Sequence, residues 1–348
     1  MPFRDVIGHR TIVSLLSRAI ARDALPPSLI FAGPSGVGKR LVAGAAAQGV
    51  NCLNPSRVPA GSPDRRSGHE SGVEFDACGT CTACARIARG MHPDVLVIEP
   101  GDSGSIKIDP IRDLIDRCHY RPFEGRRRAV IIDDADALVP AAQNALLKTL
   151  EEPPSASTFM LVTARPDLLL ATVRSRCPRL RFQLLGPDDV ARALMRRGQS
   201  EVEARAVAAT AEGSIGRALE ASGSDLVESR ELAIRLLAEA SQGDDPRRRV
   251  EGAKELLAKT GGGGATDREQ MATHLRVIAS MIRDVALLAA GADRAALANA
   301  DMEPALVRLS TFRGERGVRA FQTVDRALAA LERNASVKIV ADWVALNL

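Results

Sequence analysis

The glycine-rich stretch at residues 33–40 constrains the fold of this chain more than any other feature of its sequence. It reads Gly-Pro-Ser-Gly-Val-Gly-Lys-Arg and lies between the apolar run Leu29–Ala32 and a helical pattern from Arg40 to Val50. In a strand–loop–helix setting, backbone N–H groups and a lysine cradle phosphate groups. The pattern predicts an α/β domain with a nucleotide-binding loop, and a glycine-rich turn unrelated to nucleotides is the alternative. The candidate nucleotide-binding residues of the loop are Gly33, Gly36, Gly38 and Lys39.

The last position of this loop departs from the pattern. A nucleotide-binding loop places a Ser or Thr hydroxyl there on Mg²⁺, whereas this chain has Arg40, whose guanidinium only donates hydrogen bonds and repels a cation. We therefore expect a phosphate scaffold whose metal-dependent step is impaired, in a protein with the body of an ATPase that serves the ATP of a neighbour. Arg40 leaves open whether ATP or ADP still binds.

Polar residues follow two further strand patterns. Asp133 and Asp134 come directly after the apolar run Ala129–Ile132, and Thr163 ends the run Phe159–Thr163. Because α/β sheets bind ligands at the carboxyl ends of their strands, Asp133 and Thr163 join the candidate nucleotide site. In a phosphate-loop ATPase the first acid helps to hold Mg²⁺ and a following glutamate aligns the attacking water, a role for which Asp134 is one methylene too short. Alternatively, the two acids cap the next helix.

Four of the six cysteines predict a metal site. Cys78, Cys81 and Cys84 are separated by two residues each, and Cys52 lies far enough upstream to fold back as a fourth ligand. Four thiolates suit a closed, tetrahedral site for structural Zn²⁺, and an iron–sulfur cluster or free thiols are the alternatives. His92 is a competing ligand, although its sequence, His-Pro-Asp before a strand, is also typical of a turn.

Strand and helix patterns alternate as far as about residue 184, which predicts a mostly parallel, three-layer α/β domain over residues 1–185. The cysteines lie in an insertion at about residues 50–92. The continuous apolar run Val95–Ile98 is expected to be a strand buried on both faces. Only helical patterns follow, and they predict a helical domain at 186–243 and a second, all-helical domain at 244–348.

Composition narrows the class of protein. A net charge of +4 over 348 residues allows contact with DNA without demanding it. The first residues lack the features of a signal peptide, and no apolar run approaches the roughly 18 residues of a membrane span. These features predict a cytoplasmic protein with no membrane partner, in which reduced cysteines are available for metal. The run Arg126–Arg128 is typical of a solvated loop rather than a DNA-binding patch.

Four motifs in fixed order carry a family resemblance. They are the near-complete phosphate loop, the cysteine insertion after it, the run Asn144–Pro154, and Ser175-Arg176-Cys177. Through these motifs the first 220 or so residues resemble the bacterial clamp-loader subunits of DNA polymerase III, and within that AAA+ family the delta-prime subunits. The helical C-terminal part is similar to them only in its architecture.

The resemblance implies an AAA+ (RecA-like) ATP-binding domain with a zinc module, followed by a helical lid and an all-α collar domain that closes a five-subunit ring. The implied ring partners are delta and gamma/tau subunits, and the assembly implies the sliding clamp and primed DNA as further partners in the replisome. Delta-prime subunits generally do not hydrolyse ATP, which agrees with Arg40 and Asp134. They belong to the DNA-directed DNA polymerase holoenzyme without polymerase chemistry of their own.

The resemblance also implies a role for Arg176. In this family the arginine of the Ser-Arg-Cys motif reaches the γ-phosphate of ATP on the adjacent motor subunit, as an arginine finger does. A surface ion pair is the alternative for this residue. Where active motor subunits carry an arginine that senses nucleotide, this chain has Gly216, and Arg217 follows one residue later. One residue turns a helical side chain by about 100°, so Arg217 is a weak candidate for nucleotide contact.

Two other functions compete with that of a non-hydrolysing subunit. One is an active clamp-loader ATPase of the gamma/tau kind, which Lys39 and Asp133 permit and Arg40 opposes. The other is a nucleic-acid-binding zinc protein, which calls for basic and aromatic residues around the cysteines. The stretch Cys78–Cys84 has neither, and aromatic residues make up only 3% of the chain.

Overall fold

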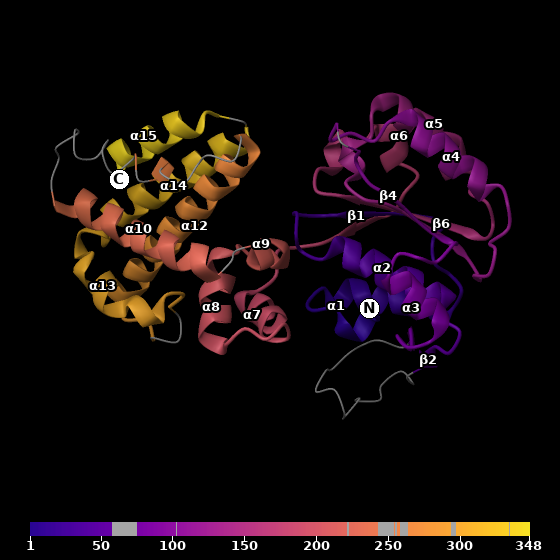
Figure 1. Cartoon of the computed structure of the whole chain (residues 1–348), viewed down its shortest axis with the longest axis horizontal. Coiled ribbons are helices and arrows are strands. Elements are labelled where there is room, and N and C mark those ends of the chain that lie inside the picture. The colour runs from indigo at the N-terminus through magenta and orange to yellow at the C-terminus, as the bar shows by residue number, and fades with distance from the viewer. Residues whose placement is uncertain are drawn as a thin grey trace. The chain divides into compact units, whose positions relative to one another are not determined.

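The computed structural model describes residues 1–57, 75–101, 103–220, 223–242, 254, 256–257, 264–293, 297–333 and 335–348. These residues form two compact units, and Figure 1 labels most of their helices and some of their strands. The first unit comprises Met1–Asp189 together with Ser214–Gly216, and the second comprises Val190–Gly213 together with Arg217–Leu348.

The first unit is built on a sheet of five parallel strands, in the order β4–β5–β6–β1–β7. Its strands are β1 (Ser28–Ala32), β4 (Val95–Ile98), β5 (Arg128–Ile132), β6 (Ser157–Thr163) and β7 (Arg179–Arg181). A separate antiparallel pair joins β2 (Ser56–Arg57) to β3 (Phe75–Asp76). The prediction of a parallel-sheet α/β domain is confirmed.

Helices cover both faces of the sheet and make three layers (Figure 1). One face carries α1 (Arg10–Ala21), α2 (Lys39–Asn51) and α3 (Thr82–Ala88), and the other carries α4 (Ile108–Cys118), α5 (Pro140–Glu151) and α6 (Ala171–Arg174). Successive residues of a strand point to opposite faces. Leu29 and Phe31 of β1 therefore pack with α1 and α2, and Ile30 packs with α4 and α5. The apolar runs in the sequence are continuous because both faces of the sheet are covered.

Strand β4 departs from its prediction. We expected Val95–Ile98 to be buried on both faces, but the Val97 side chain is exposed. Among the described residues β4 pairs with β5 alone, so it is an edge strand of the sheet. The prediction is wrong because an apolar run does not reveal whether its strand lies at the centre or at the edge.

The second unit contains helices alone within its described residues. They are α7 (Pro187–Met195), α8 (Glu201–Thr210), α9 (Ile215–Glu220), α10 (Gly223–Gln242), α12 (Gly264–Ala289), α13 (Glu303–Arg308), α14 (Glu315–Glu332) and α15 (Val337–Asn347), where α7 and α9 begin in the first unit. The apolar face of α14 buries Val324, Ala327 and Leu331. The predicted division of this part between 186–243 and 244–348 stays a prediction, because most of residues 243–263 lie outside the described part.

A search of the described helices for a stretch long and apolar enough to cross a membrane finds none.

Candidate functional site

The predicted phosphate loop lies between β1 and α2, and Lys39 is the first residue of α2. Gly36 and Gly38 have φ angles of 73° and 95°, in the left-handed region that favours glycine. The Lys39 side chain is buried, and its Nζ donates to the carbonyl oxygens of Gly33 at 2.7 Å and Pro34 at 2.6 Å. The predicted loop residues are thus brought together in one turn whose own carbonyls hold the lysine.

Arg40 lies against the acid that we predicted to hold Mg²⁺. Its Nη1 is 3.0 Å from Oδ2 of Asp133 and also contacts the carboxylate of Glu99, just beyond β4. A guanidinium between two carboxylates neutralises the negative charge that would otherwise attract a divalent cation. The contact engages one carboxylate oxygen of Asp133 with a cation, which is the arrangement expected if Arg40 impairs metal binding.

The acids at the end of β5 form one cluster with Lys39. Asp134 has a φ angle of 44° and makes no side-chain capping hydrogen bond to the turn that follows it, so the capping alternative is not supported for this residue. Burial raises the pKa of Asp134, and the nearby charges of Asp133 and Asp136 raise it further. Burial lowers the pKa of Lys39, whereas the same three carboxylates act in the opposite direction.

Thr163 lies beside the loop, but its hydroxyl is engaged. Its backbone carbonyl accepts a hydrogen bond from the N–H of Gly33 at 3.2 Å. The buried hydroxyl donates to Oδ1 of Asp136 at 2.7 Å, and Oδ2 of the same acid accepts from Nε of Arg165 at 3.0 Å. The sequence analysis did not predict Asp136 as a site residue, because no known motif places an acid three residues after the strand-end acid Asp133.

The segment Ser214–Gly216 packs on the phosphate loop. The N–H of Gly216 donates to the carbonyl of Gly36 at 2.9 Å, and the Ser214 hydroxyl donates to the carbonyl of Ser35 at 3.1 Å. A Cβ atom added at Gly216 would lie 2.8 Å from Cα of Gly36, closer than side-chain carbons approach backbone. Gly216 is therefore a close backbone contact of the loop, with no space for a side chain.

Arg217 is the next residue of α9 and the first residue of that helix that belongs to the second unit. Its guanidinium lies 2.7 Å from the carboxylate of Glu212. This ion pair agrees with the expectation that Arg217 is a weak candidate for nucleotide contact.

Arg176 lies just beyond α6, where the Ser-Arg-Cys motif leads into β7. Its side chain is 31% exposed and contacts the carboxylate of Glu151 at the end of α5. A cleft of 720 Å³ is lined by Arg174, Arg176 and Arg179, together with Ser175 and Cys177. Cys177 is a buried core residue, and burial raises the pKa of its thiol to about 11. Guanidinium groups in and around the motif therefore line a cleft, whereas the Cys177 side chain is packed in the core below it.

The four predicted ligand cysteines gather at the end of α2 and the start of α3. The sulfur atoms of Cys52, Cys78, Cys81 and Cys84 all lie within 4.8 Å of one another. Backbone N–H groups of Cys78 and Cys81 donate to the sulfurs of Cys52 and Cys78 at 3.2 and 3.3 Å. Burial alone would raise the pKa of Cys78, but N–H groups of Cys81 and Thr80 help to lower it to about 6. Thiolates bind metal, so this donor set fits tetrahedral Zn²⁺.

His92 has other partners than this cluster. Its Nδ1 accepts a hydrogen bond from the backbone N–H of Asp94 at 3.2 Å, and its Nε2 lies 3.6 Å from the Glu124 carboxylate. These contacts fit the turn that was the alternative for His-Pro-Asp, and they do not support His92 as a competing metal ligand.

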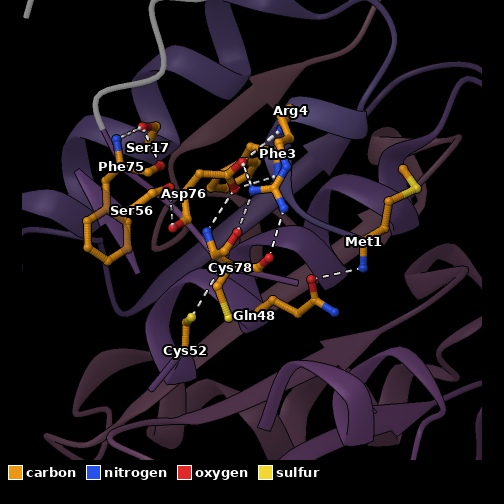
Figure 2. A network of polar contacts seen from close by, with 11 residues as sticks. Met1, Phe3, Arg4, Ser17, Gln48, Cys52, Ser56, Phe75, Asp76 and Cys78 are labelled. Carbon is orange, nitrogen blue, oxygen red and sulfur yellow. Dashed lines mark hydrogen bonds and ion pairs between the residues drawn. The ribbon is translucent and has the colours of Figure 1, made fainter. Parts of the chain in front are cut away.

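The N-terminal segment braces the cysteine cluster (Figure 2). Asp76 accepts hydrogen bonds from the N–H groups of Phe3 at 2.8 Å and Arg4 at 3.1 Å, and it pairs with the Arg4 guanidinium at 3.2 Å. The same guanidinium donates to the carbonyls of Ala77 and Cys78, each at 2.8 Å. Burial raises the pKa of Asp76 above its ordinary value, although the hydrogen bonds from Arg4 and Phe3 act to lower it. Sequence reasoning missed Arg4 and Asp76, because 72 positions separate them and no local pattern links them.

The loop between α4 and β5 is anchored from inside. Arg128 is buried, and its guanidinium lies 3.4 Å from the buried carboxylate of Asp94. It also donates to the carbonyls of Tyr120 at 2.8 Å and Arg121 at 3.1 Å. The prediction of a solvated loop for Arg126–Arg128 is wrong for Arg128, because a run of arginines does not show which of them begins the strand and meets a buried acid.

Comparisons with known proteins give one matching family model and several partial relatives. A family model described as "DNA polymerase III, delta subunit" matches residues 8–186, just over half of the chain. The DNA polymerase III subunit tau of Escherichia coli (strain K12) is 33% identical over 186 residues, which cover 53% of this chain and 26% of that protein. The DNA polymerase III subunit gamma of Buchnera aphidicola subsp. Acyrthosiphon pisum is 30% identical over 188 residues, 54% of this chain and 47% of that protein.

The matched stretch thus spans about a quarter to a half of the length of these relatives. Among solved structures, a DNA polymerase III gamma subunit-related protein from Thermotoga maritima has a TM-score of 0.40 at 18% identity, and the match covers 95% of this chain and 96% of that chain.

Proposed function

Because this chain belongs to the family described as DNA polymerase III, delta subunit, we propose that it is the delta-prime subunit of a clamp-loader complex. In this proposal it is a largely non-hydrolysing AAA+ subunit that helps to load the sliding clamp on primed DNA. It donates Arg176 to the ATP site of a neighbouring subunit and has no polymerase chemistry of its own.

The contact between Arg40 and Asp133 carries the proposal. Hydrolysis in a phosphate-loop ATPase requires Mg²⁺ between the loop hydroxyl, the strand-end acid and the phosphates. Here the loop has a guanidinium instead of a hydroxyl, and that guanidinium lies 3.0 Å from the acid. The site keeps Lys39 and its glycines, so its residues can hold a phosphate group of ATP or ADP. The loop lacks the hydroxyl for the metal, and the carboxylate of Asp133 is paired with Arg40.

Arg176 supplies what the neighbour needs. A planar guanidinium that is fixed beside a transferring phosphoryl group stabilises the charge that develops there, and this is worth about 10³-fold or more in rate. Arg176 stands on the short segment between α6 and β7, beside the cleft that Arg174 and Arg179 also line. A short segment between a helix and a strand positions such a group more firmly than a long loop does.

The other parts of the proposal follow from the same premise. Cys52, Cys78, Cys81 and Cys84 hold a structural Zn²⁺ that joins the end of α2 to α3. The helical part acts as lid and collar in a five-subunit ring with delta and gamma/tau subunits. The protein works in the cytoplasm, at the replisome.

An active ATPase of the gamma/tau kind is the second candidate function. The relatives reported above are named tau and gamma, and Lys39 and Asp133 are both present. The contact between Arg40 and Asp133 opposes this candidate, because it leaves Mg²⁺ without two of its usual protein partners.

Steady-state ATP hydrolysis, with clamp and primed DNA present, tests the proposal. The chain alone should be inert, and a ring reconstituted with motor subunits should be active. Arg176→Ala should slow the ring at the one site that receives this finger while assembly, measured by size-exclusion chromatography, stays intact. Arg112→Ala is the control, since Arg112 forms an exposed ion pair with Asp109 at 3.7 Å and does not line this cleft. Lys39-dependent hydrolysis by the chain alone would instead establish the motor function.

A further inference from the structure

The Arg176 side chain is folded back along its own chain segment. Its Nη1 donates to the carbonyl of Thr172, four residues earlier, at 2.8 Å, and it lies 3.4 Å from the Ser175 hydroxyl. Its Nη2 contacts Oε1 of Glu151. An arginine that reaches a phosphate on another subunit extends away from its own backbone. The folded-back position is therefore a different state from the one that the proposed function requires.

One atom of Arg176 is poorly satisfied in this position. Its Nε is buried and has no hydrogen-bond acceptor among the described residues. A buried donor without an acceptor opposes the conformation that buries it. The folded-back position thus depends on the bonds of the two terminal nitrogens, and Glu151 is the only charged group among those acceptors.

Glu151 is itself held in place relative to Arg176. The buried side chain of Gln143 in α5 donates to the carbonyl of Leu168 at 3.3 Å and accepts from the N–H of Leu170 at 2.7 Å, immediately before α6. These bonds fix the start of α6 against α5. At the C-terminal ends of α5 and α6, the contact between Glu151 and Arg176 joins the two helices a second time.

We propose that Glu151 is a positioning residue for the arginine finger, an internal counter-ion that holds Arg176 folded back until the triphosphate of a neighbouring subunit takes its place. The inference rests on the proposed function of Arg176. A triphosphate carries more negative charge than one carboxylate and offers several acceptor oxygens, so it competes for the guanidinium in the charged cleft beside Arg174 and Arg179. The exchange also releases the buried Nε of Arg176 to an acceptor.

Inorganic tripolyphosphate is the probe for the isolated full chain. Its dissociation constant is measured by isothermal titration calorimetry, and the arginine Nε–H signals are followed by ¹⁵N NMR. Glu151→Gln should bind the probe about 1.5- to 5-fold more tightly than the wild type, the range that corresponds to loss of a partly exposed ion pair. Glu151→Asp, which keeps the charge, should stay close to the wild type.

Glu152→Gln is the matched control, because it removes the same charge from the exposed neighbouring residue. It should change the dissociation constant less than Glu151→Gln does. In an Arg176→Ala background, Glu151→Gln should have no further effect. Equal or weaker binding by Glu151→Gln, or a gain that persists without Arg176, would overturn the assignment of Glu151.

These outcomes are independent of the ring assay. If Arg176→Ala leaves hydrolysis by the reconstituted ring unchanged, the finger function fails, whatever the tripolyphosphate titrations give. If Arg176→Ala slows the ring and Glu151→Gln leaves tripolyphosphate affinity unaltered, the finger stands and the counter-ion is refuted.

Discussion

Replacing Asp94 by asparagine tests the buried charge pair that anchors the loop between α4 and β5. Oδ1 of Asp94 accepts the N–H of Phe123 at 2.8 Å, and Oδ2 accepts those of Glu124 at 2.9 Å and Gly125 at 2.8 Å. Arg128 lies 3.4 Å away, and the two side chains are 0% and 8% exposed. Asp94→Asn keeps the shape of the side chain and removes its charge.

The expected loss follows from the burial of both groups. Removing one member of a buried ion pair leaves the other charge uncompensated and typically costs about 3–5 kcal/mol. For a unit of this size, 1 kcal/mol shifts the melting temperature by about 2–4 °C. We therefore expect Asp94→Asn to lower the melting temperature of the first unit by about 6–20 °C.

Thermal unfolding followed by circular dichroism at pH 7 measures this shift. Asp23→Asn is the control, because Asp23 pairs with Arg127 at 2.8 Å but is 84% exposed, so its loss should cost less than about 1 kcal/mol. A melting temperature for Asp94→Asn within about 2 °C of the wild type would refute the view that this pair anchors the loop.

The same variant has a defined pH dependence. Burial opposes ionisation of Asp94, but the N–H groups of Glu124, Gly125 and Phe123, together with Arg128, lower its pKa below the ordinary value. A lowered pKa means that the carboxylate stabilises the fold above its unfolded-state pKa of about 3.9 and that this contribution is lost as the pH falls through the folded-state pKa. The difference between wild type and Asp94→Asn should be complete at neutral pH and should shrink below about pH 4.

Two further predictions concern the metal-dependent features. Arg40→Thr returns a hydroxyl to the loop and frees Asp133, so Mg²⁺ should tighten ADP binding in this variant and not in the wild type. Calorimetry with and without Mg²⁺ measures the two dissociation constants. If Mg²⁺ does not tighten ADP binding by the variant, Arg40 is not what prevents metal binding. Elemental analysis should find one zinc per chain, and Cys81→Ser should lose it. Cys118→Ser should keep the zinc, because Cys118 is a buried cysteine outside the cluster. A purified wild-type chain free of metal would contradict the zinc assignment.

Local patterns in the sequence were sufficient for much of the first unit, although none of them predicted the short pair of β2 and β3. Apolar runs of four or five residues predicted four of the five strands of the parallel sheet, and the glycine spacing at 33–38 predicted the loop before α2. The spacing of Cys78, Cys81 and Cys84 predicted a cluster that the structure brings together with Cys52. Such features depend on backbone propensity and side-chain period over a few residues, which the sequence displays directly.

What the sequence by itself determined is therefore the chemistry available at single positions: a guanidinium where a hydroxyl is usual, a lysine after glycines, and three thiols at metal spacing with a fourth upstream. Only the tertiary structure decided which partner each group meets. The pairs Arg40–Asp133, Glu151–Arg176 and Arg4–Asp76 join residues 93, 25 and 72 positions apart. The exposure of Val97 likewise follows from the place of β4 at the sheet edge. These contacts depend on strand order and helix packing, and no local period records them.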